Sequence, residues 1–552
     1  MTESLISRLE SAAERGKAVT IVETDQPERL EWAQLHDDAR TLASSMQSLG
    51  VAPGDTVAVL GPTSRQVLTA IQATWLAGAA VTILPLRTRL MSENEFGEQT
   101  RSRLDASQVS LAVCDPELAP LLDPRPGGLR LLFLDEIDRQ RTSAGGSRYE
   151  RPRDDPDATA IVQFTSGSTA DPMGVVIPHR CVMDNNDAVA ERAPINADDD
   201  VVVSWAPLYH DMGLVFLFVY AMTVGADMVL STPTRFMASP GRWMRWMSEF
   251  GGTFTIGPNS SFSLASRLLA RSASLDLSRC RRLGNGSEPV DPKAMDDFTT
   301  AAAVHGLDPS SLFAAYGMAE ATVCISIPDA GTGFTDDFVD GDVLEYELEA
   351  TAVSRNHPRA RRLARCGRPV RGMEVHITDP ETGRVLGERA IGEIEVRGPS
   401  VVPGYFHRPD AARTAFRDGG WLRTGDLGYL AEADLVICGR LKDMIIVGGR
   451  NLLPTDLERV VDDVDGVRRG NVIAFGIEGR RGREAVVVVA ETKIGDVAKL
   501  RKEIASAVHS AAGIRPEEVV LVPKGTLPKT SSGKLRRSIC RARYLTSDLE
   551  TL

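Results

Sequence analysis

The stretch from Ile161 to Gly174 constrains the fold of this chain more than any other. It joins a short apolar run, IVQF, to a cluster of small hydroxyl and glycine residues. This pattern predicts a strand that runs into a loop, where glycines let the backbone approach a ligand and hydroxyl donors stand beside backbone N–H groups. Such a loop suits a polyphosphate, although an isolated Ser/Thr/Gly cluster is more often a simple polar turn. The candidate phosphate-binding residues are Thr165, Ser166, Gly167, Ser168 and Thr169.

The loop differs from two common phosphate-binding motifs. The chain has no G-x-x-x-x-G-K-[ST] sequence and no G-x-G-x-x-G after a strand, which disfavours a P-loop NTPase and a Rossmann dehydrogenase. The loop resembles instead that of the adenylate-forming superfamily, which contains acyl-CoA synthetases, luciferases and the adenylation domains of peptide synthetases. Most of those families have a lysine just before the last glycine, where this chain has Met173. This departure makes the loop more similar to the fatty acyl-AMP ligase branch.

Size and charge limit the remaining classes. With 552 residues, 43% of them hydrophobic, the chain is long enough for more than one core, so at least two domains are expected. A formal net charge of −12 argues against a surface that binds nucleic acid or anionic lipid. The seven cysteines occur singly, which indicates neither a zinc site nor a disulfide framework and suits a cytoplasmic protein. No secretory signal is expected at the start, and the apolar stretch 212–226 is short for a membrane span.

The first part of the chain alternates strand and helix patterns. Apolar residues at helical spacing predict a helix from Leu30 to Leu49, followed by a strand at 55–60, a helix at about 64–77 and a strand at 80–84. Such alternation is typical of parallel sheets with crossover helices, so an α/β fold is expected. Residues 123–156 are rich in Pro, Gly and Arg and are expected to be surface connections.

A histidine and an acid follow a later predicted strand. Residues 201–213 read VVVSWAPLYHDMG, a strand that ends in a proline-broken turn. A lone histidine in such a turn is more often structural than catalytic. The motif nevertheless resembles the second core motif of fatty acyl-AMP ligases, which implies that His210 orients the acyl carboxylate or stabilises charge near the α-phosphate. The Phe-Asp arrangement of amino-acid-activating relatives is missing, so an α-amino acid substrate is disfavoured.

The uncharged segment that begins at Met212 and Gly213 is a candidate wall of an acyl pocket. A long alkyl chain needs a dry channel, because its burial contributes about 0.8 kcal/mol per CH₂. A plain core helix is an equally good interpretation of these residues. Residues 254–259 predict another strand and turn, and the resemblance implies that Pro258 and Asn259 line the same pocket.

Two motifs resemble the superfamily's nucleotide-binding motifs. They are LGNGSEP at 283–289 and AAYGMAE at 314–320. The first predicts a glycine-flanked turn on which adenine can lie, while Tyr316 can stack on the base and Glu320 can supply an oxygen ligand to Mg²⁺. Alone, Glu320 would be an ordinary surface acid; the resemblance implies the metal role, together with Thr165. The implied nucleotide-binding residues are Gly286, Ser287, Glu288, Pro289, Ala315, Tyr316, Gly317 and Met318.

An acid-rich segment and a ribose motif follow. Residues 328–363 carry many acids and then arginines, which predicts a solvated surface excursion. Their position resembles that of an insertion in fatty acyl-AMP ligases, which implies restricted domain movement and disfavours CoA as acceptor. The sequence GGWLRTGDLG at 419–428 is similar to the superfamily's ribose motif. Asp426 is therefore expected to accept both ribose hydroxyls and Arg440 to reach the ribose or phosphate.

The resemblance also divides the chain into two domains. It implies a nucleotide- and acyl-binding domain at 1–440, in which a small distorted barrel accompanies stacked α/β sheets. A hinge at 441–443 would contain Lys442, and a small mobile α+β domain would occupy 444–552.

Two features stand out in the small C-terminal domain. A helix is expected to be capped at Thr455 or Asp456. The basic run at 527–537 would by itself be a solvated face. It resembles the superfamily's catalytic loop, however, which implies that Lys534 lies at the acyl carboxylate and the α-phosphate.

The implied function is that of a fatty acyl-AMP ligase. A fatty acid carboxylate would attack ATP·Mg²⁺ to give acyl-AMP and pyrophosphate, and the acyl group would pass to a separate acyl carrier protein, because the chain has no Asp-Ser-Leu carrier motif. An acyl-CoA synthetase is the runner-up. A non-catalytic acyl-adenylate binding protein is the alternative from another class, and it is disfavoured by the retention of Lys534, Glu320 and Asp426.

Overall fold

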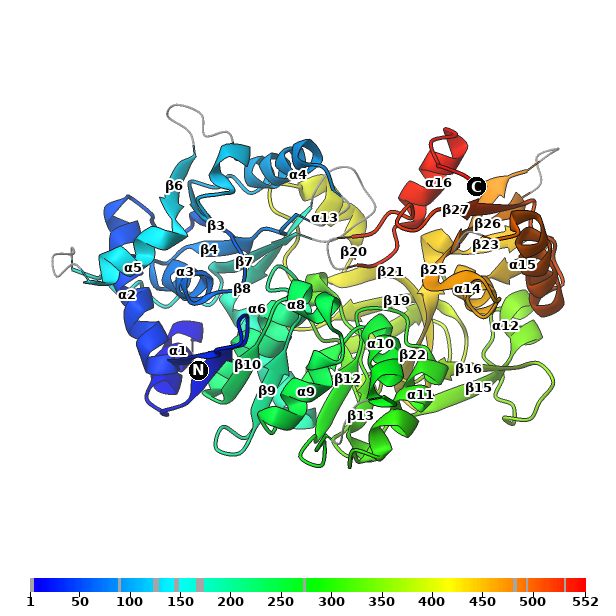
Figure 1. The fold of residues 1–552 in the computed structure, drawn as a ribbon, viewed down its shortest axis with the longest axis horizontal. Coiled ribbons are helices and arrows are strands. Elements are labelled where there is room, and N and C mark those ends of the chain that lie inside the picture. Colours follow the sequence, from blue (N-terminus) through cyan, green and yellow to red (C-terminus); the bar gives the residue numbers. More distant parts are fainter. Residues whose placement is uncertain are drawn as a thin grey trace.

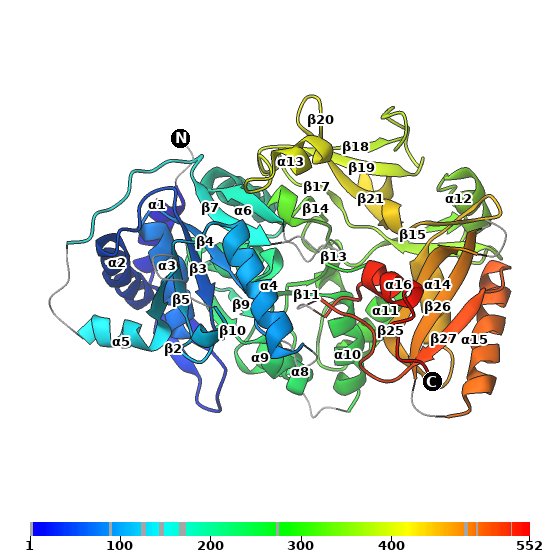
Figure 2. The ribbon, with the colours of Figure 1, turned by 90° about the horizontal axis from the view of Figure 1, so that it is seen from above.

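The computed structural model contains two stacked α/β sheets, a smaller antiparallel sheet and a small C-terminal domain (Figures 1 and 2). The expected α/β class, with a large N-terminal and a small C-terminal part, is confirmed. The structure describes residues 4–87, 91–122, 129–142, 148–164, 173–271, 275–479, 484–492, 495–530 and 533–552.

A six-stranded sheet carries the first part of the chain. Its order is β6-β5-β3-β4-β7-β8, and all strands are parallel except β8. The interpretation of 123–156 as surface connections is wrong in part, because β6 and α5 lie there and bury Leu132, Leu134 and Ile137 in the core. The elements are α2 (Trp32–Ser48), β3 (Thr56–Leu60), α3 (Arg65–Leu76), β4 (Ala80–Ile83), α4 (Glu93–Ala106), β5 (Leu111–Cys114), η1 (Ala119–Leu121), β6 (Arg130–Phe133), α5 (Leu134–Thr142), β7 (Thr159–Phe164), β8 (Gly174–Pro178) and α6 (His179–Arg192).

A seven-stranded sheet packs beside the first. Its order is β13-β12-β11-β9-β10-β1-β2, and only β2 is antiparallel. One apolar core holds residues of both sheets and the buried segment η2–α7, while α8 to α11 pack on the other face. The elements are α1 (Leu5–Ala13), β1 (Ala18–Ile21), β2 (Glu28–Glu31), β9 (Val201–Ser204), η2 (Met212–Val219), α7 (Tyr220–Val224), β10 (Asp227–Leu230), α8 (Pro233–Ala238), α9 (Arg242–Glu249), β11 (Phe254–Gly257), α10 (Asn259–Leu269), β12 (Arg282–Asn285), α11 (Pro292–Ala303), η3 (Pro309–Ser311) and β13 (Leu312–Ala314).

An antiparallel sheet and the acid-rich insertion complete the large domain. The insertion is an ordered hairpin with a helix, so the plain reading as a solvated excursion is wrong for its core: Asp337 is buried and accepts hydrogen bonds from Tyr429 (2.8 Å) and Arg389 (3.0 Å). The elements are η4 (Ala319–Ala321), β14 (Ser326–Ile327), β15 (Asp336–Asp340), α12 (Gly341–Glu347), β16 (Ala360–Ala364), β17 (Arg368–Pro369), β18 (Glu374–Thr378), β19 (Gly392–Arg397), α13 (Pro409–Ala415), β20 (Phe416–Arg417), β21 (Trp421–Ala431) and β22 (Asp434–Arg440).

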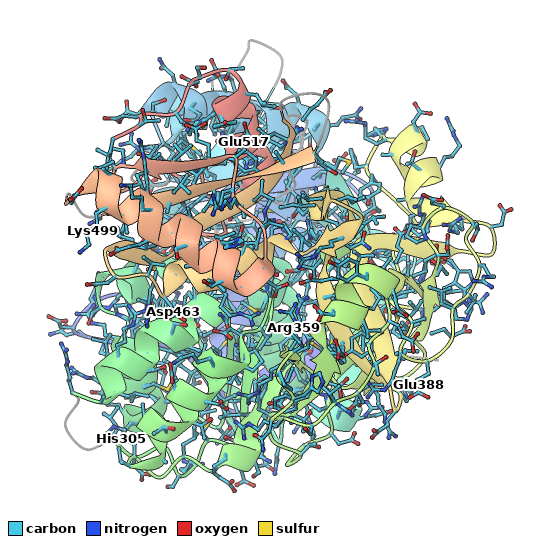
Figure 3. The ribbon with its side chains drawn as sticks, turned by 90° about the vertical axis from the view of Figure 1, so that its right-hand side faces the viewer. His305, Arg359, Glu388, Asp463, Lys499 and Glu517 are labelled. Atoms are coloured by element: carbon cyan, nitrogen blue, oxygen red, sulfur yellow. The ribbon has the colours of Figure 1, made fainter. Side chains whose placement is uncertain are left out.

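The C-terminal domain is a three-stranded sheet with flanking helices. Figure 3, which labels Lys499 on α15 and Arg359 in the insertion, shows this domain stacked on the insertion side of the large domain. The expected helix cap at Thr455 or Asp456 is wrong: α14 begins at Pro454, since proline suits the first helical position, and Leu453 precedes it without a side-chain cap. The elements are η5 (Leu441–Asp443), β23 (Ile445–Val447), β24 (Arg450–Leu452), α14 (Pro454–Asp462), β25 (Val467–Glu478), β26 (Glu484–Thr492), α15 (Val497–Ala512), β27 (Glu518–Val522) and α16 (Arg537–Leu545).

Among the helices in the described ranges, none is both long and apolar enough to cross a bilayer.

Candidate active site

His210 and Lys534 meet across the boundary between the two domains. His210 follows β9, and its Nδ1 lies 2.6 Å from Oδ1 of Asp211. The Met212 backbone N–H lies 3.3 Å from the same Nδ1. The side-chain nitrogen of Lys534 lies 3.5 Å from the other ring nitrogen of His210, Nε2. In Figure 2, the red segment before α16 reaches from the C-terminal domain toward the large domain.

The electrostatics of this contact are set by burial and by nearby acids. Burial lowers the pKa of Lys534, and the negative charges of Asp211 and Glu288 offset part of that effect. Burial alone would raise the pKa of Asp211, but the charge and hydrogen bond of His210, together with Lys534, outweigh it and hold that pKa below its ordinary value. The site therefore sets the side-chain nitrogen of Lys534 near the carboxylate of Asp211, whose ionised form the surroundings favour.

Asp426 lies in a second cluster that joins β21, β22 and the AAYGMAE motif. Its Oδ2 accepts a hydrogen bond from the Tyr316 hydroxyl at 2.7 Å, and its Oδ1 lies 3.1 Å from Nε of Arg440. Burial raises the pKa of the Asp426 carboxyl, while Arg440 and the Tyr316 hydrogen bond lower it. Each oxygen has a second lone pair, so the carboxylate can still accept hydroxyl donors. Asp426, Tyr316 and Arg440 are thus brought together.

Glu320 is held by a residue that sequence reasoning missed. The Glu320 side chain is buried in η4, and its Oε1 accepts a hydrogen bond from the Tyr405 hydroxyl at 3.0 Å. The backbone around Tyr405 also pairs with β8, since Phe406 donates to Gly174 at 2.8 Å. The only signal in the sequence was a P-G-Y-F run at 403–406 after a strand. Tyr405 therefore connects Glu320 to the end of the Ser/Thr/Gly loop.

The residues around Glu320 fit a metal site that is completed by the phosphates of a bound nucleotide. Among the described residues, no group of three or more His, Cys, Asp or Glu side chains could by itself hold a metal ion. Mg²⁺ commonly binds through one or two carboxylates and the phosphates of a substrate. Glu320 supplies one carboxylate, so it fits such a site only in the presence of a nucleotide. Thr165, the other expected ligand, lies outside the described residues.

The glycine turns are sterically required. A Cβ on Gly317 would lie 1.7 Å from the Val323 carbonyl oxygen, and one on Gly286 would lie 3.1 Å from that of Ala315. Ser287 adopts a positive φ of 71°, as expected of a tight turn. These contacts bring the turn after β12 against the backbone of the second motif at Ala315. Pro289 and Met318 belong to the same two turns.

Glu288 is engaged within the protein. Its carboxylate accepts from the Ser260 backbone N–H at 3.0 Å, at the start of α10. A carboxylate there stabilises the helix N-terminus. Its negative charge also acts on Lys534 and raises the pKa of that lysine. Glu288 thus lies near Lys534, and its expected contact with the nucleotide stays a prediction.

The expected acyl-pocket residues follow the carboxyl ends of β9 and β11, which are neighbouring parallel strands. Met212 and Gly213 begin η2, a fully buried π-helical segment, and π-helical turns are common at functional sites. A Cβ on Gly213 would lie 2.3 Å from the Pro207 carbonyl oxygen. Asn259 bridges Asn285 (3.1 Å) and the Asp291 backbone (3.0 Å). Its amide oxygen therefore holds the turns together, and Pro258 precedes α10.

The segment that carries Lys534 is tied to η5, the expected hinge, by residues that the sequence analysis did not single out. Arg537 lies 2.6 Å from Asp443 of η5 and 2.7 Å from Glu458 of α14. Glu458 also accepts from the Ala474 backbone at 2.9 Å. Lys442, the expected hinge residue, occupies η5 beside Asp443, and burial lowers its pKa. The loop with Lys534 is thus coupled to the chain segment that joins the domains.

The expected phosphate-binding residues lie outside the described part of the chain. They are Thr165, Ser166, Gly167, Ser168 and Thr169. The strands on either side are described: β7 ends at Phe164, and β8 begins at Gly174.

Comparison with known proteins decides the family. A family model described as "AMP-binding enzyme" matches residues 9–406, well over half of the chain. The chain is an AMP-binding enzyme. Its relatives include a Mycobacterium tuberculosis protein described only provisionally as a ligase, 36% identical over 94% of this chain and 95% of its own. A 4-hydroxyphenylalkanoate adenylyltransferase of Mycobacterium marinum is 31% identical over 94% of this chain and 86% of its own length.

Solved structures agree with this membership. A structure from a study of fatty acyl-adenylate ligases of E. coli and L. pneumophila aligns with a TM-score of 0.90 and 28% identity, covering 99% of this chain and 98% of its own. The structure of a fatty acid AMP ligase from Legionella pneumophila aligns with a TM-score of 0.75 and 26% sequence identity, covering 99% of this chain and 97% of its own. The AMP-binding enzyme is thus an acyl-adenylate-forming ligase, and the non-catalytic alternative is set aside.

Proposed function

We propose that this AMP-binding enzyme is a fatty acyl-AMP ligase, which activates a fatty or similarly apolar carboxylic acid with ATP and Mg²⁺. The observation that carries the proposal is the meeting of Lys534 and His210 from two domains, beside Asp211. A carboxylate that approaches ATP is repelled by its phosphates, so catalysis depends on placing positive charge between the two anions.

The reaction follows from this arrangement. One carboxylate oxygen forms a bond to the α-phosphorus as the bond to the β-phosphate oxygen breaks, which gives acyl-AMP and pyrophosphate. Lys534 would neutralise the carboxylate and the α-phosphate, and His210, oriented by Asp211, would donate or accept at the same oxygens. No covalent enzyme intermediate is required.

The nucleotide would be held by the second cluster. Asp426 would accept the ribose hydroxyls, with its orientation set by Tyr316 and Arg440, and the Tyr316 ring would face the base. Mg²⁺ bound at Glu320 would neutralise phosphate charge. The hydrogen bond from Tyr405, whose backbone neighbour Phe406 pairs with Gly174 of β8, orients the buried Glu320 carboxylate and supports that role.

The acyl group would lie along η2. Apolar, uncharged and fully buried, this segment can offer a dry wall to an alkyl chain. The names of similar proteins refer to fatty acids and to 4-hydroxyphenylalkanoates, both of which pair a carboxylate with an apolar body. A substrate panel should therefore contain both classes.

The acceptor is proposed to be the thiol of a separate acyl carrier protein. The insertion contacts the C-terminal domain through ion pairs of Arg450 with Glu345 (Nε to Oε2, 3.1 Å) and of Arg361 with Asp456. Such pairs favour one orientation of the C-terminal domain and support restricted access for CoA. The division at 1–440, 441–443 and 444–552, with rotation about Lys442, is part of this proposal.

The activation step is tested by carboxylate-dependent ATP–pyrophosphate exchange. We expect Lys534→Ala to lower exchange at least about 100-fold, because a preorganised charge at the reacting oxygens is lost, while ATP binding stays within a few fold. Lys524→Ala, an exposed lysine on the same domain, serves as the matched control. Undiminished exchange in Lys534→Ala would refute the assignment. Thioester formation with CoA against a phosphopantetheinylated carrier then separates the ligase from an acyl-CoA synthetase.

A further inference from the structure

Thr322 stands two residues after Glu320 in a backbone conformation that a β-branched residue rarely adopts. Its φ is 69° and its ψ is −60°, and the Val323 backbone N–H donates to the Ala321 carbonyl at 2.8 Å. These values define a γ-turn of the rare and strained kind that has a positive φ. Such a conformation in a residue with a branched Cβ persists only where the surrounding structure holds it, and it is concentrated at functional sites.

The γ-turn reverses the chain within a short, closed loop. Tyr316 and Ser326 form an antiparallel bridge at the base of this loop, and the Ser326 N–H donates to the Tyr316 carbonyl at 3.0 Å. The two sides of the loop are so close that a Cβ on Gly317 would lie 1.7 Å from the Val323 carbonyl oxygen. Helix η4, which carries Glu320, lies between the bridged residues and directly before the turn. The turn therefore fixes the position of the backbone from which Glu320 extends.

The strained turn is held by one neighbouring segment, between β19 and α13. The Thr322 hydroxyl donates to the Ser400 carbonyl at 2.7 Å, and both residues are fully buried. The Val402 N–H donates to the Glu320 carbonyl at 3.0 Å. The Tyr405 hydroxyl donates to the Glu320 carboxylate, also at 3.0 Å. The backbone and the side chain of Glu320 are thus held by the same segment.

That segment is itself fixed by pairing with β8, the strand that follows the Ser/Thr/Gly loop. Tyr405 forms an antiparallel bridge with Val175. Next to this bridge, the Val176 N–H donates to the Gly404 carbonyl at 3.1 Å. A side chain that is placed by strand pairing is held more precisely than one on a free loop. Glu320 is therefore positioned against the strand that leads out of the expected phosphate-binding loop.

We propose that Thr322 and Tyr405 are positioning residues, which hold the Glu320 carboxylate in place for Mg²⁺ bound together with the phosphates of ATP. The proposal rests on the acyl-adenylating function and on the role of Glu320 proposed above. Mg²⁺ demands near-ideal octahedral geometry, and groups that hydrogen-bond a metal-binding carboxylate orient it and raise the metal affinity. Because the strained turn is already formed, the carboxylate needs no rearrangement when the nucleotide arrives.

The test compares nucleotide binding with and without metal. Calorimetry measures the dissociation constant of α,β-methylene-ATP, which the enzyme cannot cleave, in Mg²⁺ and in EDTA, and the ratio gives the metal-dependent gain in affinity. Tyr405→Phe and Thr322→Val each remove one hydroxyl, while Thr322→Ser keeps it. Tyr429→Phe is the matched control, because that hydroxyl also donates to a buried carboxylate, that of Asp337, at 2.8 Å. Thermal unfolding establishes that each variant is folded, and Tyr405→Phe decides alone if Thr322→Val is not.

We expect Tyr405→Phe and Thr322→Val each to reduce the metal-dependent gain about tenfold and to leave the affinity in EDTA unchanged within about twofold. A merely structural defect would weaken nucleotide binding under both conditions. The Mg²⁺ concentration for half-maximal exchange should rise in parallel, and excess Mg²⁺ should restore most of the rate. Thr322→Ser should keep most of the gain. The double variant should lose little beyond one single variant, because both hydroxyls position one carboxylate.

Two results would overturn the positioning role. One is a metal-dependent gain that stays within about twofold of the unmodified enzyme in both Tyr405→Phe and Thr322→Val, and the other is an equal loss in Tyr429→Phe. Nucleotide binding without any metal dependence in the unmodified enzyme would overturn it as well. Absence of carboxylate-dependent exchange in the unmodified enzyme, with the metal-dependent gain still present, would instead overturn the proposed function alone.

Discussion

At the scale of single residues, the pKa of each charged group in the site depends on its burial and on the charges of its neighbours. Asp211 ionises at lower pH than an ordinary aspartate because His210 and Lys534 outweigh its burial. For Lys534, the nearby acids Asp211 and Glu288 offset only part of the lowering of its pKa by burial. Lys534 therefore loses its proton more readily than a surface lysine.

This imbalance predicts a pH dependence. Burial lowers the pKa of Lys534, so its ammonium form is present at low pH and is lost as the pH rises through that lowered value. We expect the alkaline limb of kcat/KM for carboxylate-dependent pyrophosphate release to lie below about pH 10.4, the ordinary lysine pKa. Lys524→Ala should leave the limb in place. A rate that stays constant up to about pH 10 would contradict the assignment of Lys534.

At the scale of elements, the positions of the site residues depend on close backbone packing at turns. The segment η2 can begin where it does because Gly213 lets the helix backbone lie against the carbonyl groups of Ala206 and Pro207. That packing places His210 and Asp211 at the end of β9, facing the C-terminal domain. A side chain at position 213 would push the turn away from the helix.

We therefore expect Gly213→Ala to destabilise the protein and displace His210. A Cβ at position 213 would lie 2.3 Å from the Pro207 carbonyl oxygen. The backbone must move to relieve this clash, which we expect to lower the free energy of unfolding by about 3 kcal/mol. The thermal unfolding temperature and the ATP–pyrophosphate exchange activity should both fall. Gly387→Ala is the control, since a Cβ there would meet no atom within 4 Å. Equal stability of the two variants would show that the turn can relax.

At the scale of the whole molecule, the insertion and the C-terminal domain are joined by charge. Arg450 pairs with Glu345 of α12 and also donates to the Ala512 carbonyl at the end of α15, so one side chain connects three elements. Its guanidinium lies 5.5 Å from the centre of the Tyr346 ring. These contacts are partly buried, and salt screens them less than it screens exposed pairs.

Loss of this connection should free the C-terminal domain. We expect Arg450→Gln to increase protease cleavage near 441–443 and to raise thioester formation with CoA several fold, because the orientation seen here is no longer favoured. Arg469→Gln removes an exposed pair within the C-terminal domain, with Asp463 at 3.0 Å, and serves as the control. An increase that is equal in both variants would indicate general loosening rather than release of the insertion.

Local patterns in the sequence were sufficient for much of the fold. Strands such as β3 and β4 and helices such as α2 and α3 were predicted because their apolar spacing is strong. The element pair β6–α5 was missed, since its few apolar residues lie among Pro, Gly and Arg. The buried Asp337 was also missed, because its partners Arg389 and Tyr429 are 52 and 92 residues away.

By itself the sequence determined the α/β class, the motif residues His210, Glu320, Asp426 and Lys534, and their resemblance to one enzyme family. These depend on residues that are close together in the chain. Only the tertiary structure decided that Lys534 meets His210, 324 residues away, and that Tyr405 holds Glu320. Contacts between distant segments depend on how the domains pack, and side chains that meet only through packing leave no periodic signal in the sequence.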